Sequence, residues 1–91
     1  MHRQTKYTNI SPTVKRAVYL RDNGRCVLCG LPGDPWCHVV PRSQGGLGRE
    51  ENIATLCPAC HRAYDQGPDR KVLYARLVAH LKGFYPEWSR E

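Results

Sequence analysis

Four cysteines stand in two pairs that have the spacing of metal ligands. Each pair has the form Cys-x-x-Cys, the first at Cys26 and Cys29 and the second at Cys57 and Cys60. A two-residue gap lets both sulfurs of a pair bind one ion, and four thiolates match the tetrahedral coordination of Zn²⁺. Because four protein ligands leave no open position, we predict a structural zinc. The alternatives are two disulfides or reduced thiols without a metal.

A second group of residues could carry acid–base and metal chemistry. His38 precedes a proline and a Gly-rich segment, Asn52 ends that segment, and His61 directly follows Cys60. A neutral imidazole has a reference pKa of about 6.5 and can accept a proton at pH 7. A divalent metal held by imidazole or oxygen ligands could keep open positions for water and a substrate.

These motifs resemble the HNH endonuclease superfamily, whose ββα-metal core is a hairpin packed on a helix. The resemblance covers residues 14–66. It rests on the first cysteine pair, on His-x-x-Pro-Arg-Ser-x-Gly-Gly from His38, and on Asn-(x)4-Cys-x-x-Cys-His from Asn52 to His61. The version here is similar to the small stand-alone HNH nucleases of bacteriophages and prophages. It implies a metal-dependent DNA endonuclease or nickase.

The resemblance also implies a role for each matching residue. His38 matches the general base that activates water, and His61 matches the metal-binding residue of the helix. Asn52 matches the asparagine that holds the hairpin loop through backbone hydrogen bonds. The implied catalytic metal is divalent, such as Mg²⁺, Mn²⁺, Ni²⁺ or Zn²⁺. The phage-like setting implies a terminase or another packaging protein as a partner besides DNA.

The sequence departs from the family at Cys37, where a metal-binding Asp or His usually precedes the general base. A thiolate is a poor ligand for Mg²⁺, although it can bind Zn²⁺. Asp65 offers a replacement because it lies four residues after His61 and shares its helical face. We predict His61 and Asp65 as the metal pair, with Cys37 as a third ligand. In the alternative interpretations, Asp65 pairs with Arg62 and Cys37 is a small half-buried hydrophobic residue or a reactive thiol.

Basic side chains around these motifs could bind phosphates, which would make binding salt-dependent. The predicted DNA-binding residues are Arg42, Arg49, Arg62, Arg70 and Lys71. Three further cations of the first expected helix could touch phosphate or form its solvated face, namely Lys15, Arg16 and Arg21. No pattern indicates base-specific readout in the major groove, so we expect backbone recognition with weak sequence preference.

Length and net charge limit the class of protein and the kind of partner that this chemistry can have. Ninety-one residues suit one small domain with a thin core, and 14 Lys and Arg against 8 acidic residues give a net charge of +6. We see no signal peptide, and no run approaches the roughly 20 apolar residues that span a bilayer. We expect a cytoplasmic protein of a bacterial or phage-infected cell, with a polyanionic partner and no membrane partner.

Local signals predict the elements that must position the site. In chain order we expect a helix over 12–22, a strand over 36–40, an irregular loop over 41–52, a strand over 53–56, a helix from Cys57-Pro58 to about Gln66, and a helix from Asp69 to Lys82. Gly83 is expected to cap the last helix. The fold class is α+β, a small zinc-stabilised domain over 1–91. Its parts are a flexible N-terminus (1–10), a core (12–66), and a C-terminal helix with an aromatic tail (69–91).

Three functions compete at this point. The first is an HNH endonuclease or nickase. The second is a non-catalytic zinc-finger DNA-binding or adaptor module, in which Cys37 marks a degenerate site. The third is a zinc protein that senses oxidation through Cys37. The joint presence of His38, Asn52 and His61 favours the first function.

Overall fold

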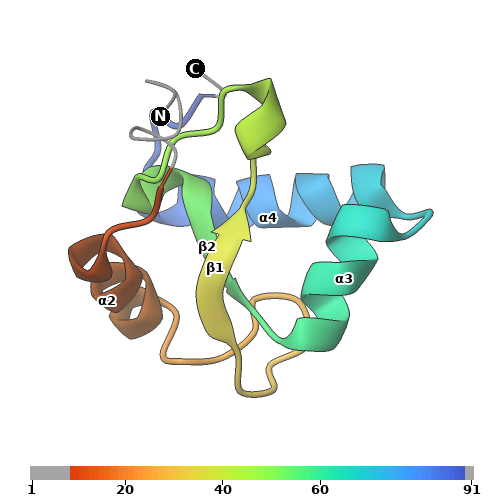
Figure 1. The fold of residues 1–91 in the computed structure, drawn as a ribbon, viewed down its shortest axis with the longest axis horizontal. Coiled ribbons are helices and arrows are strands. Elements are labelled where there is room, and N and C mark those ends of the chain that lie inside the picture. The colour runs from red at the N-terminus through yellow and green to blue at the C-terminus, as the bar shows by residue number, and fades with distance from the viewer. Residues whose placement is uncertain (1–8, 90–91) are drawn as a thin grey trace.

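A two-stranded antiparallel hairpin forms the centre of the fold, as the computed structural model shows (Figure 1). Helices α2 and α3 flank the hairpin, and α4 runs behind it. The elements are α2 (Pro12–Arg21), β1 (Asp34–His38), β2 (Ile53–Leu56), α3 (Pro58–Gln66) and α4 (Arg70–Phe84). The predicted α+β class is confirmed. The structure describes residues 9–89, so most of the expected flexible N-terminus lies outside the described residues. In the described part, no helix has the length and apolar character needed to cross a membrane.

Two helices begin with the same local signal. Ser11 caps α2 by accepting a hydrogen bond from the Val14 N–H at 3.2 Å, with Pro12 in the first turn. Cys57 caps α3 in the same way, because its sulfur accepts the Cys60 N–H at 3.4 Å. A proline loses nothing at this position, since its missing N–H would have no partner there. The predicted starts of both helices are therefore confirmed.

The first strand lies two residues earlier than predicted. It covers Asp34–His38 rather than 36–40, and the pairs Asp34–Leu56 and Cys37–Ala54 leave one extra residue of β1 as a bulge. Proline has no N–H to pair, and a bulge removes that requirement. The strand ends early because Val40 pairs with the side chain of Asn52 rather than with a strand backbone.

The last helix is longer than predicted, and Gly83 lies inside it rather than at its cap. The helix continues to Phe84, and the Tyr85 N–H still bonds to the Leu81 carbonyl at 2.7 Å. The Phe84 ring meets the His80 ring edge-on at 5.1 Å, and Tyr85 packs against the core. The ring contact within α4 and the packing of Tyr85 hold the two additional residues in the helix. The loop over 41–52 also differs from expectation, because it contains two short 3₁₀ turns, at 42–44 and 50–52.

The core lies between the hairpin, α3 and α4. Its fully buried side chains include Cys37, Val39, Leu56, Tyr64, Leu77 and Leu81. Leu73 and Val78 pack against the same cluster, so the predicted apolar face of the last helix is confirmed. Tyr64 connects α3 to the end of the first strand, because its hydroxyl donates to the Val39 carbonyl at 2.5 Å.

A buried ion pair joins α2 to the hairpin, which corrects the prediction for Arg21. Its guanidinium binds the Asp22 carboxylate with two bonds of 2.9 Å, and the two side chains are only 8% and 1% exposed. Arg21 also donates to the carbonyls of Glu50 at 2.8 Å and Ile53 at 2.7 Å. It is therefore neither a phosphate ligand nor part of a solvated face.

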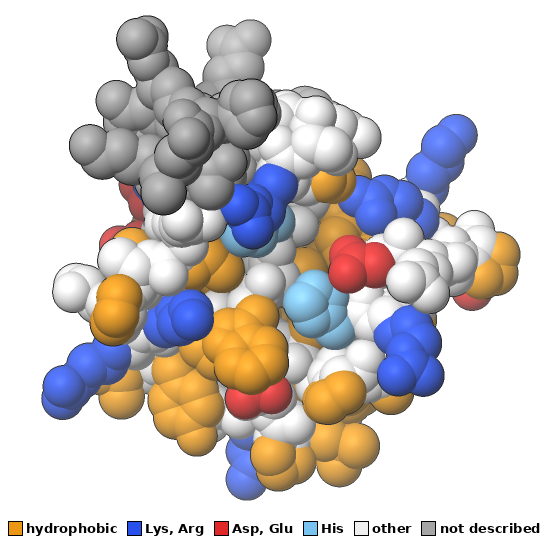
Figure 2. All heavy atoms as spheres, in the orientation of Figure 1, with side chains coloured by type: hydrophobic (Ala, Val, Ile, Leu, Met, Phe, Trp, Pro, Cys, Tyr) orange, Lys and Arg blue, Asp and Glu red, His pale blue; other side chains and the backbone are white. Residues whose placement is uncertain are grey.

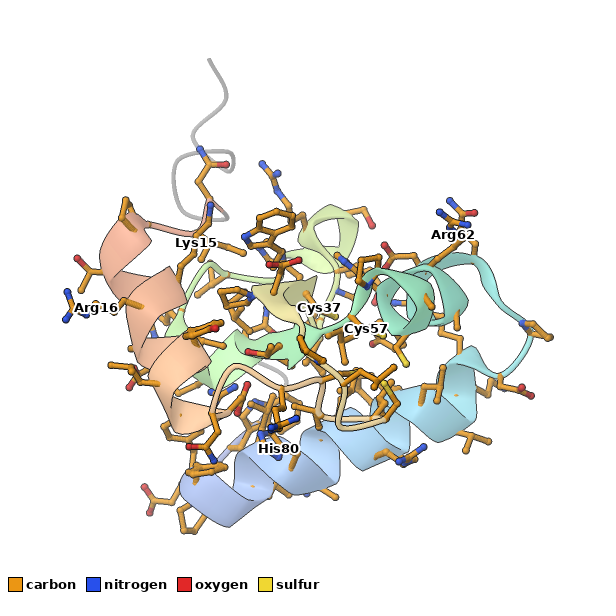
Figure 3. The ribbon with its side chains drawn as sticks, turned by 90° about the horizontal axis from the view of Figure 1, so that it is seen from below. Lys15, Arg16, Cys37, Cys57, Arg62 and His80 are labelled. Atoms are coloured by element: carbon orange, nitrogen blue, oxygen red, sulfur yellow. The ribbon has the colours of Figure 1, made fainter. Side chains whose placement is uncertain are left out.

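The same carboxylate reaches α4 and β2. Asp22 accepts the Thr55 N–H at 3.0 Å and lies 2.7 Å from His80 Nε2. Figure 3 shows the labelled His80 extending from α4 toward the other elements. Burial by itself would raise the pKa of Asp22, but the hydrogen bonds from His80 and Arg21 hold it well below its usual range. The ion pair is thus a junction of three elements.

Candidate functional site

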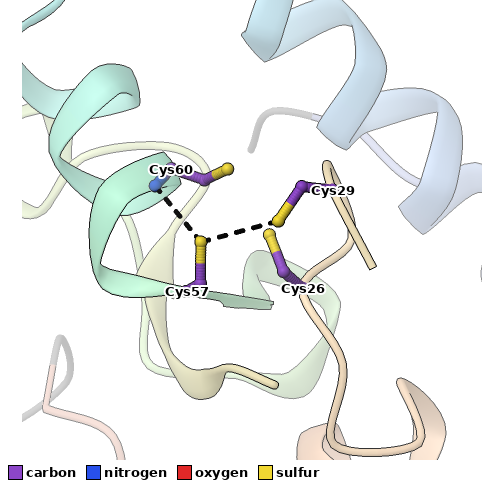
Figure 4. A group of neighbouring side chains, drawn as sticks. All are labelled: Cys26, Cys29, Cys57 and Cys60. Atoms are coloured by element: carbon purple, nitrogen blue, oxygen red, sulfur yellow. Dashed lines mark hydrogen bonds between the residues drawn. The ribbon is translucent and has the colours of Figure 1, made fainter. Parts of the chain in front are cut away.

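The four predicted zinc ligands come together in space (Figure 4). Cys26 and Cys29 lie in the loop after α2, while Cys57 and Cys60 lie at the start of α3. The four sulfurs all lie within 4.8 Å of one another, and the sulfurs of Cys29 and Cys57 are 3.6 Å apart. A tetrahedral Zn²⁺ with Zn–S bonds of about 2.3 Å requires sulfurs roughly 3.8 Å apart. The geometry therefore fits one zinc ion.

The electrostatics of the four thiols also fit a cation. Burial raises the pKa of the Cys26 thiol, but backbone N–H groups that hydrogen-bond to its sulfur, those of Cys57 and Cys29 first, lower it to about 7. Burial and the three neighbouring thiols raise the pKa of Cys60. Four thiolates this close repel one another unless a divalent ion balances them. The donor set is that of a closed structural site with no position left for a substrate.

Asn52 closes the loop that joins the two strands. Its side-chain oxygen accepts the Val40 N–H at 2.8 Å, and its amide donates to the carbonyls of Val40 at 3.2 Å and Leu47 at 2.9 Å. The side chain is buried, so these bonds are shielded from water. They are the loop-holding hydrogen bonds that the HNH resemblance implies for this residue.

Two adjacent glycines make this tight closure possible. Gly45 has a backbone φ of +85°, a conformation that other residues adopt at a cost. A Cβ on Gly46 would lie 1.7 Å from the Val40 carbonyl oxygen, which is closer than any real contact. The chain therefore turns back directly after β1, and the end of that strand is held in one position.

His38 lies at the held end of β1. Along the strand Trp36 is exposed, Cys37 is buried and His38 is half-buried. Because side chains alternate along a strand, Trp36 and His38 share one side and Cys37 faces the other. Figure 2 shows histidine side chains on the outer face, over the end of β1 and beside α3, with basic side chains around them.

His61 and Asp65 face this side of the hairpin from α3. His61 Nε2 and Asp65 Oδ2 are 3.4 Å apart, as the i, i+4 spacing predicts. Both side chains line a hollow of about 290 Å³, together with Trp36 and Asp34 of β1. An imidazole and a carboxylate suit a divalent metal, and the hollow leaves open positions for water and phosphate.

Cys37 does not line the hollow that this pair lines. It is fully buried in the core, and burial raises its pKa to about 12. Among residues 9–89, the zinc cysteines form the only group of three or more potential metal ligands that is close enough to share an ion. Cys37 therefore does not join His61 and Asp65 in such a group. The half-buried hydrophobic alternative is closer to what is found, although the burial is complete.

The predicted DNA-binding residues separate into two kinds. Arg70 packs over the Tyr64 ring at 4.5 Å and donates to the Tyr64 carbonyl at 3.1 Å, so the fold uses this side chain. The other side chains are exposed, namely those of Arg42, Arg49, Arg62 and Lys71.

Sequence reasoning missed Trp36 as a feature of the site. The period-two pattern of the strand could have found it, because that pattern places Trp36 beside His38.

Comparison with known proteins identifies the core. Residues 26–67 match the model of the family described as HNH endonuclease. This chain carries an HNH core. The matched HNH segment contains both cysteine pairs, the hairpin and α3. The family gives the chain a nuclease-type core.

Two known proteins are similar to parts of this chain. A solved structure titled as the Type IV phosphorothioation-dependent restriction endonuclease ScoMcrA superposes with a TM-score of 0.70 and 28% identity, over 86% of this chain and 17% of that one. Anaredoxin of Nostoc sp. (strain PCC 7120) is 47% identical over 30 residues, which are 33% of this chain and 40% of that protein. The HNH chain thus spans less than half the length of either protein.

Proposed function

We propose that this chain is a metal-dependent endonuclease that hydrolyses phosphodiester bonds in DNA. The observation that carries the proposal is the closure of the hairpin loop by Asn52, which fixes the end of β1 where His38 lies, while His61 and Asp65 lie 3.4 Å apart on α3. The HNH core and the likeness to a restriction endonuclease support nuclease chemistry.

Each residue then has a chemical task. His38 accepts a proton from the attacking water, and the hydrogen bonds of Asn52 keep the strand end from moving. His61 and Asp65 would hold a divalent ion, which would stabilise the phosphate charge and the leaving 3′ oxygen. We leave Cys37 out of this ligand pair because its side chain lies in the core.

The remaining parts of the chain support binding and folding. The four cysteines would bind structural zinc and so attach the start of α3 to the loop before β1. Arg42, Arg49, Arg62 and Lys71 would contact phosphates, which predicts that affinity falls with salt. Packaging proteins of a phage remain a predicted partner class.

Plasmid cleavage tests the proposal. The zinc-loaded protein is incubated with supercoiled plasmid and added Mg²⁺, Mn²⁺, Ni²⁺ or Zn²⁺, and the nicked and linear products are measured. His38→Ala should reduce cleavage about 10²- to 10⁴-fold, the usual contribution of a general base. Val72→Ala is the control, because Val72 is an exposed side chain of α4 outside the site. Intact plasmid under every metal would refute the proposal.

One observation favours a second candidate function. The family position before the general base holds Cys37, and here that side chain is buried in the core instead of facing the His61–Asp65 pair. A core that has lost this ligand could serve as a non-catalytic zinc module that binds DNA or acts as an adaptor. This candidate predicts salt-dependent DNA binding, no cleavage, and no metal binding that depends on Asp65.

A further inference from the structure

A tryptophan stands exposed on the same side of the hairpin as the proposed catalytic histidine. Trp36 is 53% exposed, although it lies on a strand whose neighbouring residues Pro35 and Cys37 are buried. A ring of this size normally contributes to stability by being buried. Its exposure leaves a face of the ring open to contact with a ligand.

The local backbone is built so that this ring is presented. The bulge in β1 falls between Asp34 and Cys37, the segment that contains Trp36. Bulges redirect a side chain and often lie next to active sites. Pro35 suits the bulge because it has no N–H to pair.

Basic side chains and a hollow lie next to the Trp36 ring. Lys15 of α2 places its Nζ 5.8 Å from the centre of the ring. The ring also lines the hollow shared with His61 and Asp65. Figure 3 shows the labelled Lys15 and Arg62 extending on the same outer side, from α2 and α3. Trp36 thus lies between cations from two helices, which favours a polyanionic partner over an uncharged one.

The part of the hollow beside Trp36 suits an uncharged planar group, whereas the part beside His61 and Asp65 is the one proposed for the metal and the scissile phosphate. Its volume of about 290 Å³ lies just below the range of roughly 300–1,000 Å³ for ligand pockets of drug-sized molecules. Asp34 lines it close to Trp36, and a carboxylate disfavours a phosphate pressed against the ring. A base can stack on an indole while its phosphates stay near the cations outside.

We propose that Trp36 is the stacking platform for an unpaired base next to the scissile phosphate. In a continuous duplex each base is covered by its neighbours, and only an unpaired or displaced base presents a free face. The inference rests on the proposed nuclease function and gives it a substrate class, DNA with an unpaired base near the cleavage site. Lys15 flanks the ring and holds the adjoining phosphate.

Binding to matched oligonucleotides tests this role. Two duplexes have identical phosphates, but one carries an unpaired thymine where the other carries an abasic residue. Fluorescence anisotropy gives the dissociation constants without added divalent metal, so no strand is cut. The full zinc-loaded chain is compared with Trp36→Leu, Trp36→Phe and the control Val72→Ala, which truncates an exposed apolar side chain of α4.

The native protein should bind the unpaired-base duplex more tightly than the abasic one. Trp36→Leu should weaken binding to the unpaired-base duplex by roughly 5- to 150-fold and leave the abasic duplex nearly unchanged. Trp36→Phe should restore most of the difference, and Val72→Ala should change neither duplex. Zinc content and circular dichroism check that each variant is folded.

Other outcomes overturn the inference. An equal loss on both duplexes would make Trp36 a general backbone contact, and no loss would point to a partner other than nucleic acid. Failure of phenylalanine to restore the difference would exclude stacking. Because binding is measured separately from cleavage, stacking without plasmid cleavage refutes only the nuclease function, and cleavage without base-dependent binding refutes only the role of Trp36.

Discussion

Removal of the Asp22 carboxylate should destabilise the whole domain. Asp22→Ala leaves the Arg21 guanidinium 8% exposed with no carboxylate, and it deprives the Thr55 N–H and His80 of their partner. Removal of one member of a buried ion pair typically costs about 3–5 kcal/mol, because the other charge stays buried without compensation. A natural domain of this length has a free energy of unfolding of about 5–14 kcal/mol. The change should therefore remove a large fraction of the stability.

Guanidinium unfolding of the zinc-loaded protein measures this loss. The free zinc concentration must be the same for all variants, because a bound metal adds to the apparent stability. The double variant Arg21→Met/Asp22→Ala should lose less than the sum of the two single losses, since it leaves no buried charge behind. Arg16→Ala is the matched control on α2, where the side chain is exposed and a change within about 0.5 kcal/mol is expected.

A small loss of stability in the Asp22→Ala variant would refute this reasoning. If Asp22→Ala costs less than about 1 kcal/mol, the pair behaves like a surface salt bridge. Additive losses in the double variant would likewise mean that Arg21 and Asp22 act independently. In either case the junction would not be what holds α2 and α4 to the hairpin.

Four further predictions concern single sites. Chelation of zinc, or Cys60→Ser, should abolish the cooperative thermal transition seen by circular dichroism, because metal binding and folding are coupled in small zinc domains. A native transition that survives chelation would contradict this. Burial raises the pKa of Tyr64 to about 12. Since the unfolded pKa is about 10, the stability from Tyr64 is present below pH 10 and is lost as the pH rises through 12. Tyr64→Phe should remove the late phase of the tyrosinate absorbance, and an unchanged titration would argue against it. Gly46→Ala should cost about 1–3 kcal/mol because its Cβ meets the Val40 carbonyl, whereas Gly83→Ala, with open space around it, should not destabilise. Equal unfolding midpoints for the two variants would refute this contrast. Finally, Cys37 should react with a thiol reagent only after unfolding, because burial raises its pKa to about 12; rapid labelling of the native protein would revive an oxidation-sensing role.

Features with a local signal could be predicted from the sequence. A capping side chain followed by proline marks the starts of α2 and α3, and the Cys-x-x-Cys spacing marks the sulfurs that gather. The position of Asn52 in its motif also pointed to the loop bonds that the structure contains. In each case the signal itself lies within a few residues, although the cysteine pairs and the Asn52 bonds then join segments 28 and 12 positions apart.

Features that depend on distant partners could not be predicted in this way. His80 and Asp22 are 58 positions apart, and no periodicity links them. The same holds for Arg21, whose surface prediction failed because its carbonyl acceptors come from another part of the chain. The two added residues of α4 depend on packing of Tyr85 against the core, a contact that outweighs the helix-ending tendency of Gly83.

The bonds around β2 also protect the protein from association through its sheet. A two-stranded sheet leaves an open edge on each strand, and unpaired backbone groups there can recruit a strand from another molecule. On the outer edge of β2, Ile53 donates to Glu50 and accepts from Arg21, while Thr55 donates to Asp22 and accepts from Val27. Every outward backbone group of these two residues is therefore occupied. The ion pair thus acts in place of a third strand. Its loss would leave backbone groups on the edge of β2 free to pair with another molecule, and it would also leave a buried charge without a partner.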